Sequence, residues 1–411
     1  MQTDLVIIGA GPGGYRAAEY AACQGLKVVV FEDGHVGGTC LNVGCIPTKT
    51  YVHSASFAEA RERMQQVVGQ LRSGVETILS HPNITLVREK ASLVDNHTVV
   101  CSISGDTITT KNIIIATGSE TKWLPIKGLD DPRVVDSTGL LNLETQPKRL
   151  AIIGAGVIGM EFASVFNRFG SEVTVIEFLK ECLPALDSDI AKRLRKTLEK
   201  QGVTFKMKTA VENIADIDAD VVLMATGRKP RVQADFANAG VEFNERAGVK
   251  VDDDFQTSVK GIYAIGDVNG RQMLAHAAEM QAVRAVNHIL GKADGIRFDI
   301  MPAAIFTEPE AACVGPTEEQ LKENGVEYVC KKSFWRANGK ALAMGETEGM
   351  LKLFASPEGA IMGCHAYGAH AADIVQEVSV LMCKQATLQE LADMVHIHPT
   401  LSEILTNAAE N

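Results

Sequence analysis

The sequence has no long hydrophobic run. A membrane-spanning helix needs ~18 or more consecutive apolar residues, whereas the apolar runs here, such as residues 113–116, have the length of a strand. Residues 1–4 lead at once into the apolar run 5–8, which leaves no room for the basic start of a signal or transit peptide. We therefore expect a cytoplasmic protein that has no membrane partner.

The sequence also lacks an excess of basic residues. Its 40 lysines and arginines are outnumbered by 51 aspartates and glutamates, so the formal net charge is −11 at pH 7. Nucleic acids and anionic membrane surfaces attract proteins with the opposite balance. The charge therefore argues against nucleic acid as a partner and leaves the substrate open.

The nine cysteines do not form the pattern of a disulfide framework or of a metal site. Seven of them are scattered singly, and a reducing cytosol disfavours structural disulfides. No second pair of cysteines or histidines has the spacing of zinc ligands, so we expect no metal. The exception is Cys40 and Cys45 within residues 37–49, which read GGTCLNVGCIPTK. Such a close pair indicates catalysis, and two incidental buried thiols are the alternative.

The cysteine pair requires a bent backbone if its thiols are to meet. In a regular α-helix, residues five apart lie about 8–9 Å from each other at Cα, whereas the Cα atoms of a disulfide lie about 4.4–6.8 Å apart. Gly37, Gly38 and Gly44 supply conformational freedom for such a bend. We therefore expect a distorted segment around the two cysteines.

A glycine-rich pattern occurs twice in the chain. Residues 5–14 read LVIIGAGPGG, and residues 150–159 read LAIIGAGVIG. In both copies a strand-like run precedes the glycines and a helical stretch follows them. An acid, Glu32 or Glu177, stands 18 residues after the last glycine. This arrangement is typical of dinucleotide-binding folds, so we predict two of them in tandem.

Each residue type in this pattern has a physical task. The first glycine permits the tight turn, the second lets the backbone approach a pyrophosphate, and the third lets helix and strand pack closely. The helix N-terminus then faces the phosphates, and the acid accepts hydrogen bonds from a ribose. The candidate nucleotide-binding residues are Gly9, Gly11, Gly14 and Glu32 in the first copy and Gly154, Gly156, Gly159 and Glu177 in the second.

Residues 37–49 resemble the redox-active motif of the flavin-dependent disulfide oxidoreductases, most closely that of their dihydrolipoamide dehydrogenase branch. Along the chain stand, in the family's order, the first glycine pattern, the cysteine pair, Ala-Thr-Gly, the second glycine pattern, Ala-Thr-Gly-Arg, Gly-Asp and a C-terminal His-Pro-Thr. The resemblance implies FAD at the first pattern and NAD at the second. It also implies that Cys45 is the thiol beside the flavin and that Cys40 is the interchange thiol that meets the substrate.

The resemblance implies further residues at the cofactors. Lys49 would stand beside the reactive edge of the flavin with Glu161 as its ion-pair partner, and a lysine four residues after Cys45 also favours a thiolate. Asp267 would hold the ribityl chain of FAD. Ala277 departs from the family pattern, which more often has lysine there. The other residues expected at FAD are Thr39, Thr117, Gly118, Leu274 and Ala275, and those expected at NAD include Glu161 and Gly227.

A second catalytic group is expected near the end of the chain, where residues 396–403 read HIHPTLSE. Thiol–disulfide exchange needs a group that accepts and returns a proton, and histidine does so near neutral pH. The resemblance implies His398 as this base, oriented by Glu403, with His396 in a structural role. In the family this histidine reaches the active site of the other subunit, so a homodimer is implied.

The expected fold class is α/β, with two tandem Rossmann-like domains followed by a C-terminal α+β dimerisation domain. The expected boundaries are 1–147 with 230–298 for the FAD-binding domain, 148–229 for the NAD-binding domain and 299–411 for the C-terminal interface domain. The chain is shorter than is typical of the family. The missing residues are expected within 50–112 and 209–225, where no motif residue stands.

The resemblance implies an enzyme that oxidises dihydrolipoamide to lipoamide and reduces NAD⁺. Its partners would be the lipoyl groups of a 2-oxoacid dehydrogenase complex or of the glycine cleavage system. NAD is expected rather than NADP, because Glu177 would repel a 2′-phosphate and residues 178–181 contain no arginine.

Two alternatives stay open at this point. The first is a sibling disulfide reductase. Glutathione-type enzymes have arginines after the second acid and mercuric reductases have a C-terminal cysteine pair, and this chain has neither; transhydrogenases usually lack one of the two cysteines. The second alternative is a compacted flavoprotein with little turnover, which the two shortened regions motivate.

Overall fold

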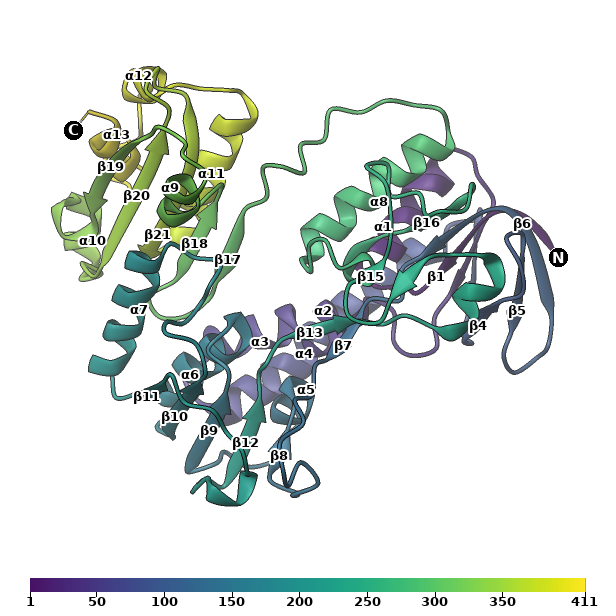
Figure 1. Cartoon of the computed structure of the whole chain (residues 1–411), viewed down its shortest axis with the longest axis horizontal. Helices are drawn as coiled ribbons and strands as arrows, with labels where there is room; N and C mark the ends of the chain where they lie inside the picture. The colour runs from purple at the N-terminus through teal and green to yellow at the C-terminus, as the bar shows by residue number, and fades with distance from the viewer. Residues whose placement is uncertain (411) are drawn as a thin grey trace. The chain divides into compact units, whose positions relative to one another are not determined.

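The computed structural model describes residues 1–410 of the chain, which form two compact units (Figure 1). Unit 1 comprises Met1–Trp123 and Gly227–Ile296, and unit 2 comprises Leu124–Thr226 and the chain from Arg297 onward. Each unit is therefore assembled from two separate stretches of sequence. Within residues 1–410, no helix is both long enough and apolar enough to cross a membrane.

Unit 1 is built on a seven-stranded sheet of order β3-β2-β1-β6-β5-β4, in which β16 also pairs with β6. The pairs among β1, β2, β3, β6 and β16 are parallel, whereas β4 and β5 form an antiparallel extension. Leu5, Val6 and Ile7 of β1 are fully buried, as is usual for a parallel strand with both faces covered. The strands are β1 Gln2–Ile8, β2 Val28–Phe31, β3 Ile84–Val87, β4 Ala91–Leu93, β5 Thr98–Cys101, β6 Thr107–Ile115 and β16 Ile262–Ala264.

Helices from both stretches of unit 1 pack together. Helix α1 contacts α8, and the Tyr20 hydroxyl of α1 donates to Asn287 Oδ1 of α8 at 2.9 Å. A small antiparallel pair, β7 and β13, joins the two stretches again. These elements are α1 Pro12–Cys23, α2 Gly38–Val43, α3 Cys45–Val52, α4 Phe57–Leu79, β7 Ser119–Thr121, β13 Arg228–Pro230, η2 Ala234–Ala239, β14 Phe243–Asn244, β15 Gly248–Val249, η3 Gly266–Asn269 and α8 Ala275–Ile289.

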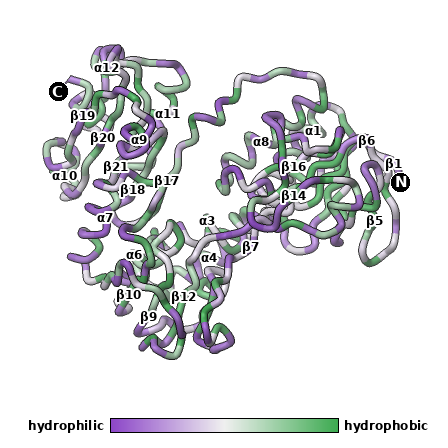
Figure 2. Tube along the Cα trace, in the orientation of Figure 1, coloured by the Kyte–Doolittle hydropathy of each residue, from purple (hydrophilic) through white to green (hydrophobic). Residues whose placement is uncertain are grey.

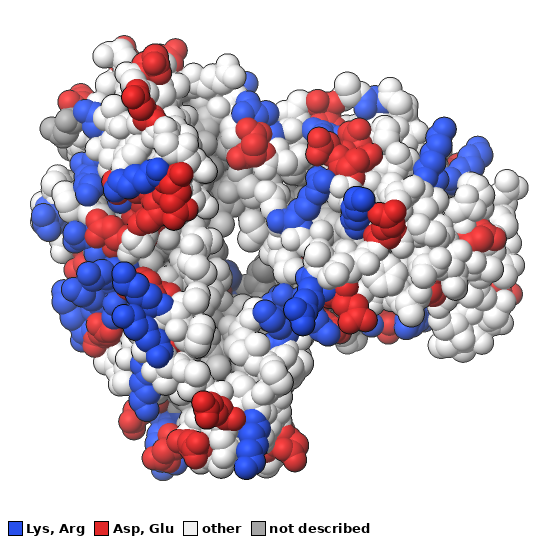
Figure 3. Space-filling model, in the orientation of Figure 1, with Lys and Arg blue, Asp and Glu red and all other residues white. Residues whose placement is uncertain are grey.

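Unit 2 contains a five-stranded parallel sheet of order β11-β10-β9-β12-β8. Its central strands are apolar and buried, in keeping with the hydrophobic stretches in Figure 2. Helix α7 carries four exposed basic residues, Lys192, Arg193, Lys196 and Lys200, and Figure 3 shows basic side chains gathered around this helix, with acidic ones beside them. The elements are β8 Val134–Val135, α5 Ser137–Leu141, β9 Arg149–Ile153, α6 Val157–Arg168, β10 Glu172–Glu177, α7 Ser188–Lys200, β11 Thr204–Met207, η1 Ile214–Asp216 and β12 Val221–Met224.

Unit 2 also contains a five-stranded antiparallel sheet of order β17-β18-β21-β20-β19. Helix α11 packs on β18 and β21, and α13 packs on β19 and β20, which together enclose a core around Trp335. The elements are β17 Ala303–Ile305, β18 Ala311–Val314, α9 Glu318–Glu323, β19 Val329–Phe334, η4 Trp335–Ala337, α10 Gly339–Met344, β20 Gly349–Ala355, β21 Ile361–Gly368, α11 Ala371–Cys383, α12 Leu388–Ala392 and α13 Glu403–Glu410.

The predicted fold class is confirmed: the chain has two α/β folds, each with a glycine pattern directly after one strand, β1 or β9, of its largely parallel sheet, and a C-terminal α+β part. The two compact units do not divide the chain in the same way as the three predicted domains, because unit 2 joins the second nucleotide fold to the C-terminal part. The boundaries near residues 147, 229 and 298 therefore stay a prediction.

Candidate active site

The first glycine of each pattern stands in the same backbone conformation. Gly9 and Gly154 both have φ +106°, which a residue with a side chain rarely adopts. A Cβ at Gly154 would lie 2.5 Å from the carbonyl oxygen of Ala225, and a Cβ at Gly9 would overlap the carbonyl of Ala116 in the same way. The Ala-Thr-Gly segments are thus the neighbours that leave no room for a side chain at the turn.

The third glycine of each pattern lets its helix lie directly on the turn. A Cβ at Gly14 would overlap the carbonyl oxygen of Gly9, and a Cβ at Gly159 would overlap that of Gly154. Helices α1 and α6 therefore begin as close to their strands as backbone contact allows. This is the packing that a dinucleotide fingerprint requires.

The acid after each second strand is bonded to its glycine turn. Glu32 accepts hydrogen bonds from Ala10 N and from the N–H two residues after itself, both at 2.9 Å. Glu177 does the same with Ala155 N at 2.6 Å and with the N–H two residues further on at 2.7 Å. Both carboxylates are therefore held at the turn, where the ribose of a bound dinucleotide would meet them.

Both turns suit the phosphates of a dinucleotide. Gly11 and Gly156 occupy the N-cap positions of α1 and α6, and glycine has no side chain with which to cover the N–H groups of the first turn. These N–H groups and the positive end of the helix dipole attract a diphosphate. The residues present thus fit the diphosphate of a dinucleotide at both turns, and the assignment of FAD to the first and of a pyridine nucleotide to the second stays a prediction.

The cysteine segment is bent at Gly44, between α2 and α3. Gly44 has φ −135° and ψ −114°, which no regular helix contains. A Cβ at this position would lie 2.8 Å from the carbonyl oxygen of Thr39 and 3.2 Å from the Cα of Cys40. The break folds the start of the helix that carries Cys45 against the preceding turn.

The two thiols interact across this bend. Neither cysteine is in a disulfide bond, and Cys45 is exposed while Cys40 is partly buried. Hydrogen bonding to the Cys45 thiol and burial raise the pKa of Cys40 far above its usual range, while the positive charge of Lys49 lowers it. The segment therefore holds a dithiol whose sulfurs are near each other, with a cation beside them, as exchange with a second dithiol requires.

The cysteine segment also packs on the first glycine turn. A Cβ at Gly38 would lie 2.6 Å from the Cα of Gly11, and Gly37 N donates to Ala10 O at 2.8 Å. The sequence predicts that these two glycines, with Gly44, let the cysteine segment bend. The bend itself lies at Gly44, whereas Gly37 and Gly38 allow the cysteine segment to touch the first glycine turn.

Asp267 stands in η3 as a buried carboxyl. Burial raises its pKa, while the Ser119 hydroxyl and the charge of Arg228 lower it. Ser119 donates to Asp267 Oδ2, and Arg228 Nε donates to Ser119 Oγ at 2.7 Å. Ser119 is not among the residues expected from the sequence, and Arg228 is noted there only as part of a motif, with neither residue connected to Asp267. The signal that could have found them is their position, because each directly follows an Ala-Thr-Gly segment.

The other residues expected at FAD also belong to unit 1. Thr117 Oγ1 donates to Arg231 O at 2.7 Å, and Gly118 O accepts from Arg231 N at 2.9 Å. Leu274 is the N-cap of α8 and Ala275 is its first residue. Thr39 lies in α2, directly before Cys40. Their contact with FAD stays a prediction.

The predicted pair of Lys49 and Glu161 joins residues of different units. Lys49 lies in α3 of unit 1. Glu161 lies in α6 of unit 2, where it is buried and accepts a hydrogen bond from Phe306 N at 2.9 Å. Gly227, expected at NAD, has φ +96° at the end of its Ala-Thr-Gly segment. The ion pair and the NAD contact therefore stay predictions.

His398 is paired with Glu403 within unit 2. Glu403 Oε1 lies 2.8 Å from His398 Nδ1, and its other oxygen accepts from Thr400 N at 2.8 Å. Both contacts lower the pKa of the Glu403 carboxyl, and the hydrogen bond from Thr400 N has the larger effect. The imidazole is 79 % exposed, so Nε2 is the ring nitrogen available for proton exchange.

His396 lies in a different environment from that of His398. Its side chain is only 10 % exposed, and Nε2 lies 2.9 Å from Glu377 Oε1. Thr406 Oγ1 lies 2.8 Å from the other ring nitrogen. Glu377 belongs to α11 and Thr406 to α13, so His396 links the segment between these two helices to both of them. Such a position suits the structural role expected for His396.

Two family models match almost the whole chain. Residues 3–282 match the pyridine nucleotide-disulphide oxidoreductase model, and residues 301–409 match the dimerisation domain of the same family. The second match supports a homodimer. The first match implies FAD and a pyridine nucleotide as cofactors.

Similar proteins include enzymes of several names. The chain is 39 % identical to the mitochondrial dihydrolipoyl dehydrogenase of Pisum sativum, over 99 % of this chain and 91 % of that protein. It is 38 % identical to a leghemoglobin reductase of Glycine max, over 99 % and 87 %. Among solved structures, the HOCl-induced flavoprotein disulfide reductase RclA of Escherichia coli has a TM-score of 0.93 at 33 % identity, over 99 % of both chains. The alignment with the pea protein spans 455 positions against 411 residues here, so that protein has internal segments that this chain lacks.

Proposed function

The chain belongs to the pyridine nucleotide-disulphide oxidoreductase family, and within this family we propose that it is a dihydrolipoyl dehydrogenase that uses NAD⁺. The observation that carries the proposal is the cysteine pair. Cys40 and Cys45 interact across the bend at Gly44, on a segment that touches the first nucleotide turn. Similarity to dihydrolipoyl dehydrogenases over the whole chain supports the choice of a small dithiol as substrate.

In the dithiol step we give each cysteine the role that the family resemblance implies. In the oxidised enzyme, one thiolate of dihydrolipoamide attacks Cys40 Sγ of the Cys40–Cys45 disulfide, and Cys45 leaves as a thiolate. The second substrate thiol then attacks the mixed disulfide, which releases lipoamide and leaves Cys40 reduced. The two electrons of the substrate thus reside in the cysteine pair, while a base takes up the thiol proton.

His398 is the residue that would accept this proton. Its Nδ1 is held by the Glu403 carboxylate at 2.8 Å, which fixes the orientation of the ring and leaves Nε2 for the thiol proton. In the homodimer that the dimerisation domain supports, His398 would act on the cysteine pair of the other subunit.

FAD, when bound, would carry the two electrons from the cysteine pair to NAD⁺. Gly9, Gly11, Gly14 and Glu32 would hold FAD, with Asp267 at its ribityl chain. The second turn would hold NAD, because Glu177 can bond a free 2′-hydroxyl and no arginine follows within residues 178–181.

The proposal assigns a role to each predicted domain. Residues 1–147 and 230–298 would bind FAD, 148–229 would bind NAD and 299–411 would form the dimer. The lipoyl groups of a 2-oxoacid dehydrogenase complex or of the glycine cleavage system would be the source of the dithiol. Lys49 with Glu161 would stand at the flavin.

The test is the visible spectrum of the purified protein, titrated with dihydrolipoamide without oxygen. We expect a flavin spectrum that develops a long-wavelength charge-transfer band after two electrons, and we expect that band to be absent from Cys45→Ser. NADH and NADPH are compared in the reverse direction. Bound flavin that dihydrolipoamide leaves unchanged would overturn the proposal in favour of a sibling reductase, and colourless protein would favour a compact form that no longer binds FAD.

A further inference from the structure

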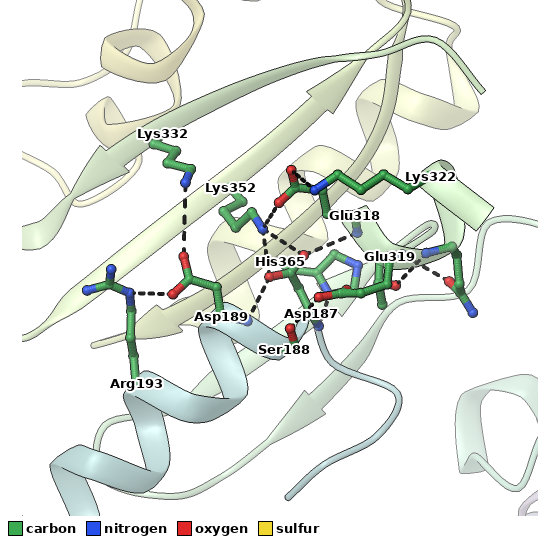
Figure 4. Close-up of polar contacts among 12 residues, drawn as sticks. Asp187, Ser188, Asp189, Arg193, Glu318, Glu319, Lys322, Lys332, Lys352 and His365 are labelled. Carbon is green, nitrogen blue, oxygen red and sulfur yellow. Dashed lines mark hydrogen bonds and ion pairs between the residues drawn. The ribbon is translucent and has the colours of Figure 1, made fainter. Parts of the chain in front are cut away.

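Unit 2 encloses a group of charged side chains that the proposed reaction does not use (Figure 4). Lys352 of β20 is 1 % exposed, and its Nζ lies 2.7 and 2.8 Å from the two carboxylate oxygens of Asp187 and 2.6 Å from Glu318 Oε2. A buried ammonium is costly unless it is paired and hydrogen-bonded. Lys352 therefore holds Asp187 in one place, and its loss would leave a buried carboxylate without this cation.

Asp187 is bound through its backbone as well as through its carboxylate. Its N–H donates to Nδ1 of the buried His365 at 3.0 Å. Nε2 of the same ring lies 3.1 Å from Pro316 O, so Nε2 carries the proton and the ring is neutral. The carboxylate also accepts from Asp189 N at 3.2 Å, as the N-cap of α7. The start of α7 is thus tied to β20 and β21 at several atoms.

A short chain of hydrogen bonds leads from Asp187 back to the second glycine turn. Leu186 N, directly before Asp187, donates to Leu183 O at 2.9 Å, and Leu183 N donates to Ala155 O at 3.0 Å. Ala155 is the residue between the first two glycines of the pattern, and its own N–H donates to Glu177 at 2.6 Å. Leu183 has φ +49° and is buried. Its unusual backbone is therefore held by its surroundings.

We propose that Lys352 is a positioning residue for the pyridine nucleotide, acting through Asp187 and Leu183 on the turn that contains Ala155 and on Glu177. Lys352 itself need not touch the nucleotide. The inference rests on the proposed function only in taking the second glycine turn as the nucleotide site. It adds a residue from the C-terminal sheet to the determinants of nucleotide affinity.

The neighbouring strand offers a matched control. Lys332 of β19 stands directly opposite Lys352 in the antiparallel pair. It is 46 % exposed and lies only within 4.0 Å of Asp189 on the same helix. Lys332→Met therefore removes the same charge from the same pair of strands and leaves the buried cluster intact.

The experiment is anaerobic stopped-flow reduction of the bound flavin by NADH over a range of NADH concentrations. For Lys352→Met we expect the apparent Kd for NADH to rise about tenfold, with the limiting rate and the rate of flavin reduction by dihydrolipoamide within about twofold of the unmodified enzyme. Lys332→Met should match the unmodified enzyme. All rates are expressed per bound flavin, so that a loss of folded protein does not count as an effect.

Asp187→Asn provides a second, milder variant. It keeps the N-cap oxygen and the Lys352–Glu318 pair, so it should fold even if Lys352→Met does not, and we expect an apparent Kd for NADH about threefold higher. An unchanged Kd in the variant that folds would overturn the inference, as would a parallel loss in the dithiol reaction, which indicates a merely structural role. An unmodified enzyme whose flavin neither NADH nor NADPH reduces would instead overturn the proposed function, and the inference with it.

Discussion

In both nucleotide folds the alanine between the first two glycines accepts a hydrogen bond from a residue with positive φ. At the first turn the donor is Gly37 N, at 2.8 Å from Ala10 O, and at the second it is Leu183 N, at 3.0 Å from Ala155 O. Gly37 has φ +94° and Leu183 has φ +49°. The two turns thus share a bond that lies outside the glycine pattern itself.

The two folds differ in the segment to which that bond leads. After Gly37 the chain enters the cysteine segment, which touches the first glycine turn through Gly38. After Leu183 it enters α7, whose first turn is held by the buried pair of Asp187 and Lys352. The same turn is therefore joined to a reactive group in one fold and to a distant sheet in the other.

The largest effect is expected from Cys40→Ser, which should impair the reaction with the dithiol and spare the reaction with NADH. Flavin reduction by dihydrolipoamide should fall at least about a thousandfold, because the sulfur that the substrate attacks is gone. Reduction by NADH, which depends on the second turn, should stay within about twofold of the original rate. Stopped-flow absorbance measures both. Cys23→Ser, at an exposed cysteine of unit 1, is the control, and an equal loss in both reactions would contradict the separation.

A smaller effect is expected when each third glycine is replaced. Gly14→Ala would press a methyl group into the carbonyl of Gly9, so FAD affinity should fall at least about a hundredfold and the protein should purify with little flavin. Gly159→Ala should leave the flavin bound and weaken NADH instead. The ratio of flavin absorbance to protein gives the first result, and NADH titration gives the second.

Gly69→Ala is the matched control for the glycine variants. Nothing lies within 4 Å of a Cβ at Gly69 in α4, so alanine should keep the flavin and stabilise this helix by about 1 kcal/mol. If Gly14→Ala retained as much flavin as Gly69→Ala, the first turn would not be the FAD site.

The smallest effect concerns Asp267, which has no counterpart described for the second turn. Its pKa in the folded state is raised by burial, so the folded state loses stability as the pH rises through that value and the buried carboxyl becomes charged. Asp267→Asn should therefore raise the melting temperature of flavin-free protein at pH 7 by about 2–4 °C, and the gain should shrink as the pH falls. Thermal unfolding followed by circular dichroism measures this, with exposed Asp106→Asn as control. A lower melting temperature at pH 7 would show that Ser119 and Arg228 make the carboxylate net stabilising.

Short-range patterns located most of the candidate site. Cys40 and Cys45 are five residues apart, as are His398 and Glu403, and Glu32 follows Gly14 within one strand–helix–strand unit. Contacts of this range depend on local backbone geometry, which residue types and spacing indicate directly. The bend is predictable for the same reason, although the sequence could not tell which of the three glycines bends and which two touch the nucleotide turn.

Contacts between distant residues could not be predicted in this way. Ser119 and Arg228 come together because β7 pairs with β13, and Asp267 joins them because η3 packs against β13. In the sequence, Lys352 is one lysine in a strand that reads GMLKLFA, a position where a solvated side chain is the usual expectation. Its burial results from the packing of α7 against the C-terminal sheet, over a separation of 165 residues from Asp187.

The sequence by itself determined the family, the fold class, the two glycine turns and the candidate residues of the thiol chemistry, because each is encoded in residue types at fixed short spacings. Only the tertiary structure decided which backbone atoms meet at Gly38 and Gly11, which hydroxyl faces Asp267, and that the second turn is linked to Lys352. These depend on how strands and helices pack, and a buried charge can be told from a solvated one only when its neighbours in space are known.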